Sequence, residues 1–179
     1  HSAGAFILVL LVVLAACAPP PAAPAATPTP APESGRAAVV AFVVALRTLD
    51  RDAEAWWRDF EAYMQRAPSM QQTPMLSEFD GMNARYDALL ERLKGVRPPA
   101  EPAAEAAYAR WVTAFAKTQE FVRALREVAA TRQGDPGKLQ ALDAESTAAG
   151  AQASDAMQEL ITKHELKPEE ITPPARGGR

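Results

Sequence analysis

Thiol and imidazole side chains, which ligate transition metals and serve in nucleophilic catalysis, are scarce in this chain. The 179 residues include one cysteine, Cys17, and two histidines, at positions 1 and 164. A single cysteine excludes an internal disulfide framework and a thiolate zinc cage, and His164 alone cannot supply the Glu-x-x-His pairs of a di-metal carboxylate bundle. His164 is expected on the surface near a helix C-terminus, where a cation is favoured. Since the isolated glycines also form neither a phosphate loop nor a nucleophile elbow, we predict no enzyme, no catalytic residue and no metal site.

Methionine thioethers are a second group that could bind a metal. Met64, Met70 and Met75 bracket one connecting segment, and Met82 follows it. In an extracytoplasmic protein, thioethers can bind Cu(I). Met75 and Met82 also fall on an apolar helical repeat, where methionine fills gaps in a core. Two interpretations follow: ordinary core packing, or a copper carrier that uses the Met64–Met75 loop.

Aromatic side chains and a stretch of small residues form a third candidate site. The possible ligand or partner contacts are Trp56, Trp57, Trp111 and Tyr86. Three of them fall on apolar helical repeats, which predicts core positions, whereas Trp57 adjoins a repeat and is expected at a helix boundary or on the surface. Residues 146–156 are almost all small. They indicate either close packing against large aromatic side chains or a cavity that holds a small molecule.

An apolar segment precedes the single cysteine. Residues 5–16 carry no charge, and the run is shorter than the roughly 20 residues that span a membrane. Its length fits the hydrophobic region of a signal peptide, although a signal-anchor helix would use the same run. Cys17 follows Leu14-Ala15-Ala16 directly. The chain starts at His1 without a positively charged n-region, so we expect residues 1–16 to be a signal peptide truncated at its start.

The segment Leu14-Ala15-Ala16-Cys17 resembles the lipobox of bacterial lipoprotein precursors. The resemblance implies cleavage between Ala16 and Cys17, with diacylglycerol and an N-acyl chain such as palmitate attached to Cys17. No other cofactor is expected. It also implies a lipid-anchored, extracytoplasmic protein of the cell membrane or outer membrane, because two or three acyl chains anchor a protein stably whereas one binds only marginally.

A proline-rich segment separates the cysteine from the rest of the chain. Seven prolines occur between positions 18 and 34, among alanine and threonine. This composition cannot bury a core and favours polyproline II. We therefore expect residues 17–34 to be a lipidated cysteine followed by a disordered tether of about 45 Å.

Beyond residue 34, prolines occur in clusters separated by long proline-free windows. Proline inside a helix costs about 3 kcal/mol, so the clusters mark helix ends. Thr73-Pro74 and Asp135-Pro136 place a capping residue before a proline, and Gly134 is expected at a helix C′ position. Apolar residues recur at alternating spacings of three and four in every window. The predicted helices span about 35–66, 74–97, 101–133 and 136–166.

These elements predict an all-α protein, an antiparallel up-down-up-down four-helix bundle over residues 35–166 with a disordered tail over 167–179, in which Ile171 is expected to form a loose cap on the end of the bundle. Thr118 and Ser146 face the core and are expected to bond a carbonyl one turn back. The first helix balances Arg36, Arg47, Arg51, Arg58 and Arg66 against Asp50, Asp52, Glu54, Asp59 and Glu61. We interpret these charges as a solvated outer face rather than a recognition patch.

The net charge of −3 gives no reason to expect a nucleic-acid partner. The sequence therefore predicts a lipid-anchored envelope protein with a structural, adaptor or interaction role, an unidentified envelope protein as partner, and no obvious small-molecule ligand. The alternative is a carrier of a small molecule or copper, which would use a cavity beside the small-residue fourth helix or the Met64–Met75 loop.

Overall fold

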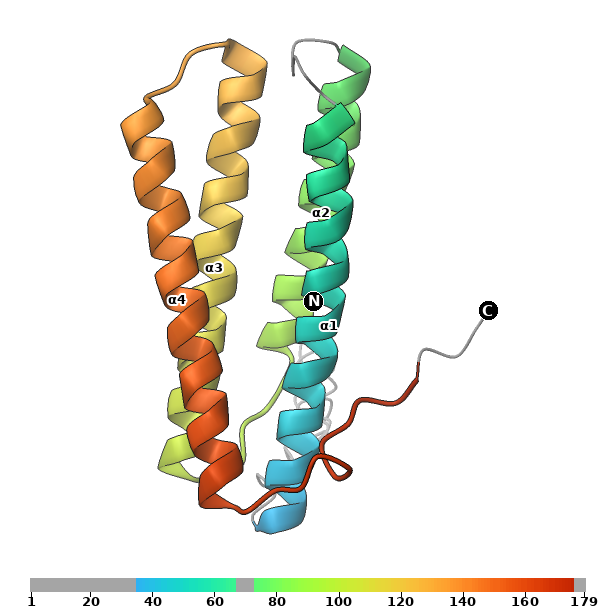
Figure 1. Cartoon of the computed structure of the whole chain (residues 1–179), viewed down its shortest axis with the longest axis vertical. Coiled ribbons are helices and arrows are strands. Elements are labelled where there is room, and N and C mark those ends of the chain that lie inside the picture. Colours follow the sequence, from blue (N-terminus) through green and yellow to red (C-terminus); the bar gives the residue numbers. More distant parts are fainter. Residues whose placement is uncertain (1–34, 67–72, 176–179) are drawn as a thin grey trace, which may run out of the picture. The chain divides into compact units, whose positions relative to one another are not determined.

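The structure of the chain, a computed structural model, describes the backbone of residues 35–66 and 73–175 and the side chains of 35–66 and 76–175. This part of the chain is built from four helices, and no strand occurs in it. The helices are α1 (Arg36–Arg66), α2 (Thr73–Lys94), α3 (Pro102–Thr131) and α4 (Pro136–Lys163). They form a four-helix bundle (Figure 1), which confirms the predicted fold class. The predicted signal peptide and tether lie outside the described residues.

Helix starts follow the proline signals closely. α4 begins at Pro136, and the Asp135 side chain caps it by accepting a hydrogen bond from the Gly137 N–H at 2.8 Å. α3 begins at Pro102, directly after Glu101 in an extended conformation. α2 begins at Thr73, one residue before the predicted start. Proline at the first helical position removes no helical hydrogen bond and is therefore common there. These helix starts could for this reason be predicted from the sequence.

Helix ends are less regular. α2 ends at Lys94, three residues before the predicted position, because Gly95 closes it and its N–H bonds the carbonyls of Glu91 and Arg92. α3 ends at Thr131, and Arg132, not Gly134, adopts the left-handed conformation with φ 56°. The predicted C′ role of Gly134 is therefore wrong. Gly134 instead lies against Val128, since a Cβ at position 134 would lie 2.4 Å from a Val128 methyl carbon.

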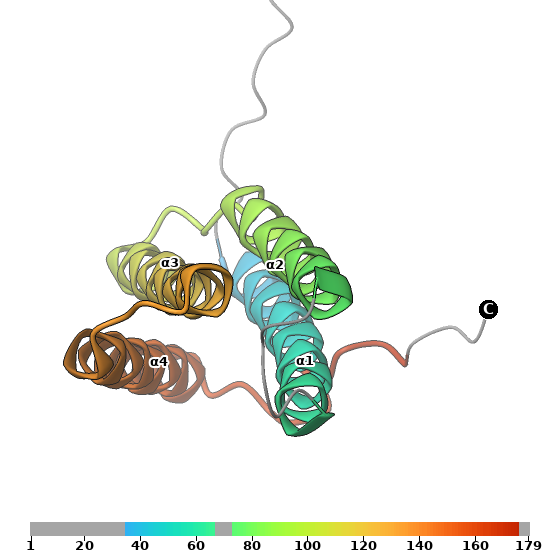
Figure 2. The same ribbon diagram turned by 90° about the horizontal axis from the view of Figure 1, so that it is seen from above.

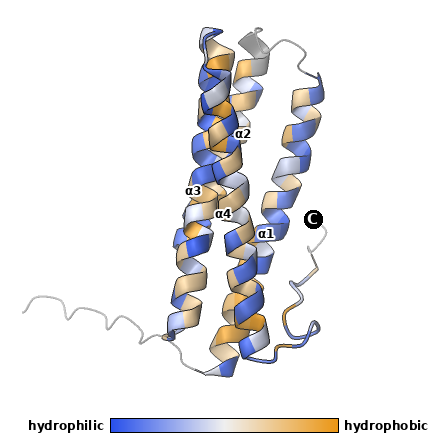
Figure 3. Ribbon diagram, turned by 60° about the vertical axis from the view of Figure 1, so that its left-hand side comes forward, coloured by the Kyte–Doolittle hydropathy of each residue, from blue (hydrophilic) through white to orange (hydrophobic). Residues whose placement is uncertain are grey.

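The apolar repeats form one core. Ten α1 residues are buried. They include all those at the predicted spacing of three and four: Val39, Phe42, Leu46, Leu49, Ala53, Trp56, Phe60 and Tyr63. On α4 the buried residues include the small side chains Ser146, Ala149, Ala153 and Ala156. Figure 3 shows hydrophobic and hydrophilic residues alternating around each helix. The repeat of three and four thus predicts which face of each helix is buried.

The four helices do not pack equally closely. α3 and α4 pack most closely, and the small α4 residues explain this because they let two backbones approach. α2 also packs against both α1 and α3. Among the described helices, α1 and α4 are not a closely packed pair, although they are the two that would close the ring seen in Figure 2.

The segment after α4 is ordered through residue 175. The sequence predicts a disordered tail over 167–179, but residues 167–175 form turns and bonded segments, and Ile171 is buried in the core together with Leu166. The segment crosses from α4 to α1 (Figure 2). There Arg36 donates to both carboxylate oxygens of Glu170, at 2.5 and 2.8 Å. The predicted disorder is therefore wrong for 167–175, because one buried isoleucine and a bidentate ion pair fix this segment.

We expect this tail to loosen in acid. The Arg36 guanidinium and the Lys167 backbone N–H lower the pKa of Glu170 from 4.5 to about 2. The charged carboxylate is the bonded form, so its contribution to stability is complete above about pH 4.5 and is lost as the pH falls through about 2. Glu170→Gln should mimic this loss at neutral pH by lowering the hydrogen-exchange protection of the Ile171 amide.

Glu169→Gln is the matched control, because Glu169 is exposed and forms no hydrogen bond or ion pair within the described residues. The control should keep full protection at Ile171. Equal protection in Glu170→Gln and Glu169→Gln would show that the ion pair does not hold the tail.

Candidate functional site

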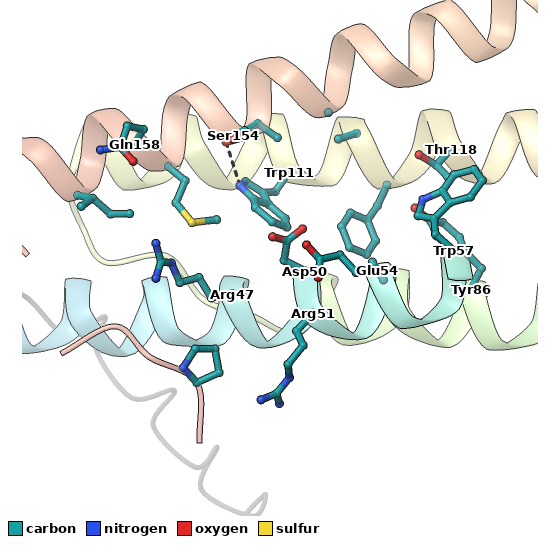
Figure 4. Close-up of a pocket in the computed structure, with 18 residues that line it drawn as sticks. Arg47, Asp50, Arg51, Glu54, Trp57, Tyr86, Trp111, Thr118, Ser154 and Gln158 are labelled. Carbon is teal, nitrogen blue, oxygen red and sulfur yellow. Dashed lines mark hydrogen bonds between the residues drawn. The ribbon is translucent and has the colours of Figure 1, made fainter. Parts of the chain in front are cut away.

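An open cleft lies between α1 and α4, where the bundle is not closely packed. Its volume is about 540 Å³. α1, α3 and α4 supply most of its lining, with single contributions from Tyr86 of α2 and Pro173 of the tail. Figure 4 shows the cleft between the two outer helices with the aromatic side chains behind it. The structure therefore places a cavity beside the small-residue helix, at the location that the second interpretation of residues 146–156 requires.

Aromatic rings form the floor of this cleft. Trp111 and Phe115 of α3 have ring centroids 5.9 Å apart, and Phe115 stacks on Tyr86 at 5.7 Å. The Trp111 indole N–H donates to the Ala153 carbonyl at 3.1 Å, which fixes the ring against α4 (Figure 4). Such a floor presents an apolar surface with fixed orientation, as in small-molecule sites.

A short polar chain lies at one end of the floor. Thr118 and Ser146 share a hydrogen bond of 2.8 Å between α3 and α4. The expectation that each would bond a carbonyl one turn back is therefore wrong, because the close approach of these helices brings the two hydroxyls together. Burial raises the pKa of the Tyr86 phenol to about 12, and the interaction with Thr118 acts in the opposite direction. The phenol thus stays neutral at physiological pH.

Charged residues of α1 form the rim. Asp50 and Glu54 lie one helical turn apart, and Figure 4 shows both carboxylates directed into the cleft toward Trp111. Burial raises the pKa of Asp50, and repulsion by Glu54 raises it further, while Arg47 acts in the opposite direction. Arg51 points away from Trp111 and donates to the Pro174 carbonyl at 2.8 Å. The negative charges therefore face the aromatic floor.

The interpretation of the α1 charges as a solvated outer face is only partly correct. Asp52 and Asp59 lie toward α2 and pair with Arg92 and Arg85, at 2.9 and 2.6 Å. Arg47, Asp50 and Glu54 instead line the cleft. The spacing of Asp50 and Glu54 is the one sequence signal for their position at the cleft. Two acids at i and i+4 place like charges on one helix face, a mildly destabilising arrangement.

The structure separates the four aromatic candidates. Trp57, Trp111 and Tyr86 line the cleft, but Trp56 does not. Trp56 is 1% exposed, and its indole N–H donates to the Met82 carbonyl at 2.8 Å. Trp57 is half-buried and packs against the core, at the helix boundary expected for it. Core positions are confirmed for Trp56, Trp111 and Tyr86 by their burial.

A second hollow lies beside α1 and α2, with a volume of about 660 Å³. Its lining includes Asp52, Asp59, Arg85 and Arg92, which already pair with one another in the two α1–α2 ion pairs. A ligand there would have to break these pairs, so the α1–α4 cleft is the better candidate.

The methionines do not converge in the part that the structure describes. Met82 is buried in the core and Met64 is partly buried against it. Met70 and the Met75 side chain lie outside the described residues. Within residues 35–66 and 76–175, no group of three or more His, Cys, Asp and Glu side chains could hold a metal ion.

His164 is less exposed than the sequence suggests. Its side chain is 19% exposed, and its Nε2 lies 3.0 Å from the Glu101 carboxylate, which also pairs with Lys163 at 3.4 Å. Burial opposes ionisation of Glu101, but hydrogen bonds from His164 and Lys163 lower its pKa overall. His164 thus joins the end of α4 to the start of α3 and does not itself line the cleft.

The chain shows no similarity that would assign a function to the cleft. None of the described helices is long and apolar enough to cross a membrane. Comparison of the chain with protein-family models, with curated proteins and with solved structures finds no match.

Proposed function

We propose that this protein is a lipid-anchored, extracytoplasmic and non-catalytic binding module of the cell envelope, and that the α1–α4 cleft is its binding site. The lipobox-like segment ending at Cys17 supports the anchor. The proline-rich residues 18–34 would hold the bundle away from the lipid surface. The bound molecule would be small, with a body that the aromatic floor can cover.

The proposed bundle topology is antiparallel, up-down-up-down. Three α1–α2 ion pairs support it, because residue numbers rise along α1 as they fall along α2: Asp52–Arg92, Asp59–Arg85 and Arg66–Glu78. The α3–α4 hydrogen bonds Trp111–Ala153 and Thr118–Ser146 have the same reversed order. In such a topology α1 and α4 are neighbours at the end of the chain path, and a gap between them opens the core to ligands.

The cleft itself is the observation that carries this function. Its volume of about 540 Å³ lies within the range of about 300–1,000 Å³ typical of small-molecule pockets. Its floor is aromatic, and its charged residues come mainly from one wall. A bundle with a purely structural role would gain stability by closing this gap with larger α4 side chains, since burying apolar surface stabilises a fold.

Gly150 provides the test. It lines the cleft, and a Cβ built on it would meet nothing within 4 Å. Gly150→Phe should therefore fill part of the cleft without disturbing the core. Binding is measured with N-phenyl-1-naphthylamine, an uncharged dye that fluoresces in apolar sites. The probe is titrated into the mature chain from Cys17 onward, produced without acylation so that no lipid phase competes for the dye.

Gly81→Phe is the matched control, because Gly81 of α2 also has open space around a built Cβ and does not line the cleft. We expect Gly150→Phe to weaken dye binding at least about tenfold, which corresponds to about 1.4 kcal/mol, and Gly81→Phe to leave it unchanged. Equal binding by both variants, or no binding by the unaltered chain, would contradict a binding function for the cleft.

A further inference from the structure

We propose that the α1–α4 cleft selects an organic cation, a protonated amine or quaternary ammonium with an apolar body. This inference rests on the proposed function and adds the chemical class of the ligand. Asp50 and Glu54 would hold the cationic group, and Trp111 with Trp57 would cover it and the adjoining carbon atoms. Three independent features of the cleft support this assignment.

The first feature is that the two carboxylates in the cleft are unpaired. Neither Asp50 nor Glu54 forms a hydrogen bond or an ion pair within 4.0 Å in the part of the chain that the structure describes. On the α2 side of the same helix, Asp52 and Asp59 each pair with an arginine. Glu61 of α1 also lacks a counter-ion among the described residues but does not line the cleft. Asp50 and Glu54 are thus the unpaired α1 acids at the cavity, where a ligand could supply a counter-ion.

The second feature is the charge balance of the cleft. Arg51 is turned away and bound to the tail at Pro174. The lining holds two carboxylates and two guanidiniums. Because the Arg51 guanidinium is directed away, the charged groups that point into the cleft are Asp50, Glu54 and Arg47, which together carry a net charge of −1. The α4 residues that line it are all uncharged: Gly150, Ala153, Ser154, Met157, Gln158 and Ile161. A ligand with one positive charge would complement the charged groups of the α1 wall.

The electrostatics of Asp50 agree with this balance. Burial and the neighbouring Glu54 raise its pKa, and Arg47 does not offset them. Because Asp50 as a whole residue is exposed, its carboxylate keeps contact with water in the open cleft, and a bound cation would oppose the upward shift of its pKa.

The third feature is the position of the indole rings. Trp111 lies directly across from the two carboxylates in Figure 4, and its N–H is already used by Ala153. Trp111 is 5% exposed, so it offers the margin of its ring to the cleft, while the half-buried Trp57 offers a larger indole surface. Tryptophan faces attract ammonium groups through the ring quadrupole, more strongly when the cation is desolvated. Carboxylates beside indole rings therefore suit an ammonium group attached to an apolar body.

Three probes with one carbon skeleton test the assignment: 4-phenylbutylamine, 4-phenylbutan-1-ol and 4-phenylbutyrate. They differ in the charge of the terminal group, which is positive, neutral or negative at neutral pH. Each is titrated into the unacylated mature chain by calorimetry. We expect the amine to bind at least about tenfold more tightly than the alcohol, and the carboxylate to bind more weakly than the alcohol.

The double variant Asp50→Asn, Glu54→Gln should abolish the preference for the amine and leave the Kd of the alcohol within about twofold. The matched control is Asp143→Asn, Glu159→Gln, which removes two exposed α4 carboxylates that do not line the cleft. This control should keep the preference. Circular dichroism verifies that both variants are folded, and the comparison of probes on the unaltered chain requires no variant.

The outcomes separate this inference from the proposed function. If the amine and the alcohol bind equally and Gly150→Phe blocks both, the cleft is a binding site without selectivity for cations, and the inference is wrong. Preference for 4-phenylbutyrate, or an amine preference that survives in Asp50→Asn, Glu54→Gln, would also overturn it. If no probe binds, both the inference and the proposed function fail.

Discussion

Trp56→Ala is expected to lower the free energy of unfolding by about 3–5 kcal/mol, the range for truncating a buried tryptophan. Trp56 is 1% exposed and stacks on Phe60 with a centroid distance of 4.9 Å. The Trp56 and Tyr86 rings are in an edge-on arrangement with centroids 4.8 Å apart, and the Trp56 indole N–H donates to the Met82 carbonyl of α2. Alanine would leave a cavity between α1 and α2 and remove that hydrogen bond. Urea unfolding followed by far-ultraviolet circular dichroism measures the change.

Trp57→Ala is the control for this prediction. Trp57 is the next residue, has the same side chain and is half-buried at the margin of the core. Its truncation should cost about 1 kcal/mol, near the average for point substitutions. A larger loss of stability for Trp57→Ala than for Trp56→Ala would contradict the orientation of α1 on which the cleft depends.

Cys17→Ser is expected to abolish acylation and cleavage, so that the mature lipid-anchored protein is not made. A serine hydroxyl cannot take the place of the thiol in lipobox modification, so the resemblance implies a precursor that is neither acylated nor cleaved. Each buried CH₂ of an acyl chain contributes about 0.8 kcal/mol to membrane binding. Losing two or three chains therefore changes the partition of the mature protein by many orders of magnitude. The chain, expressed behind a complete signal peptide, is labelled with palmitate and separated into membrane and soluble fractions.

Ala18→Ser is the matched control, because it introduces the same side chain one residue later and keeps the thiol. The control should retain palmitate label and membrane association at the level of the unaltered chain. Equal labelling of Cys17→Ser would contradict acylation at this residue. Unchanged electrophoretic mobility and unchanged membrane retention of Cys17→Ser, with no palmitate label on the unaltered chain, would instead favour the signal-anchor interpretation of residues 5–16.

The positions of the helices could be predicted from the sequence, but several of their ends could not. Pro102 and Pro136 begin helices because proline is compatible only with a first turn. The end of α4 depends on Glu165, which adopts φ 49° and lets Leu166 turn back onto the core. The residue type at position 165 does not predict this left-handed conformation, since glutamate rarely adopts it. The same limit applies to the tail, whose order depends on long-range contacts of Ile171 and Glu170.

The small and aromatic residues of the candidate site could be predicted from the sequence, but its charged residues could not. The small residues of the fourth helix, with Tyr86, Phe115 and Trp56 facing them, indicate a cavity as one interpretation. The cleft lies there, and Tyr86 and Phe115 line it, whereas Trp56 does not. Asp50 and Glu54 were missed, because a charged helix face has the same pattern whether it meets water or an open cleft. The difference depends on how far α1 lies from α4. Periodicity predicts which face is buried but not the distance between two helices.

The three tryptophans allow the most direct measurement of ligand binding in the α1–α4 cleft. Each gives one indole resonance in a ¹H–¹⁵N spectrum, assigned with single Trp→Phe variants. When 4-phenylbutylamine is titrated into the ¹⁵N-labelled mature chain, the Trp57 and Trp111 resonances should shift with one common Kd, and the buried Trp56 resonance should stay in place. A shift at Trp56 alone, or no shift at Trp111 at saturating amine, would contradict binding in this cleft.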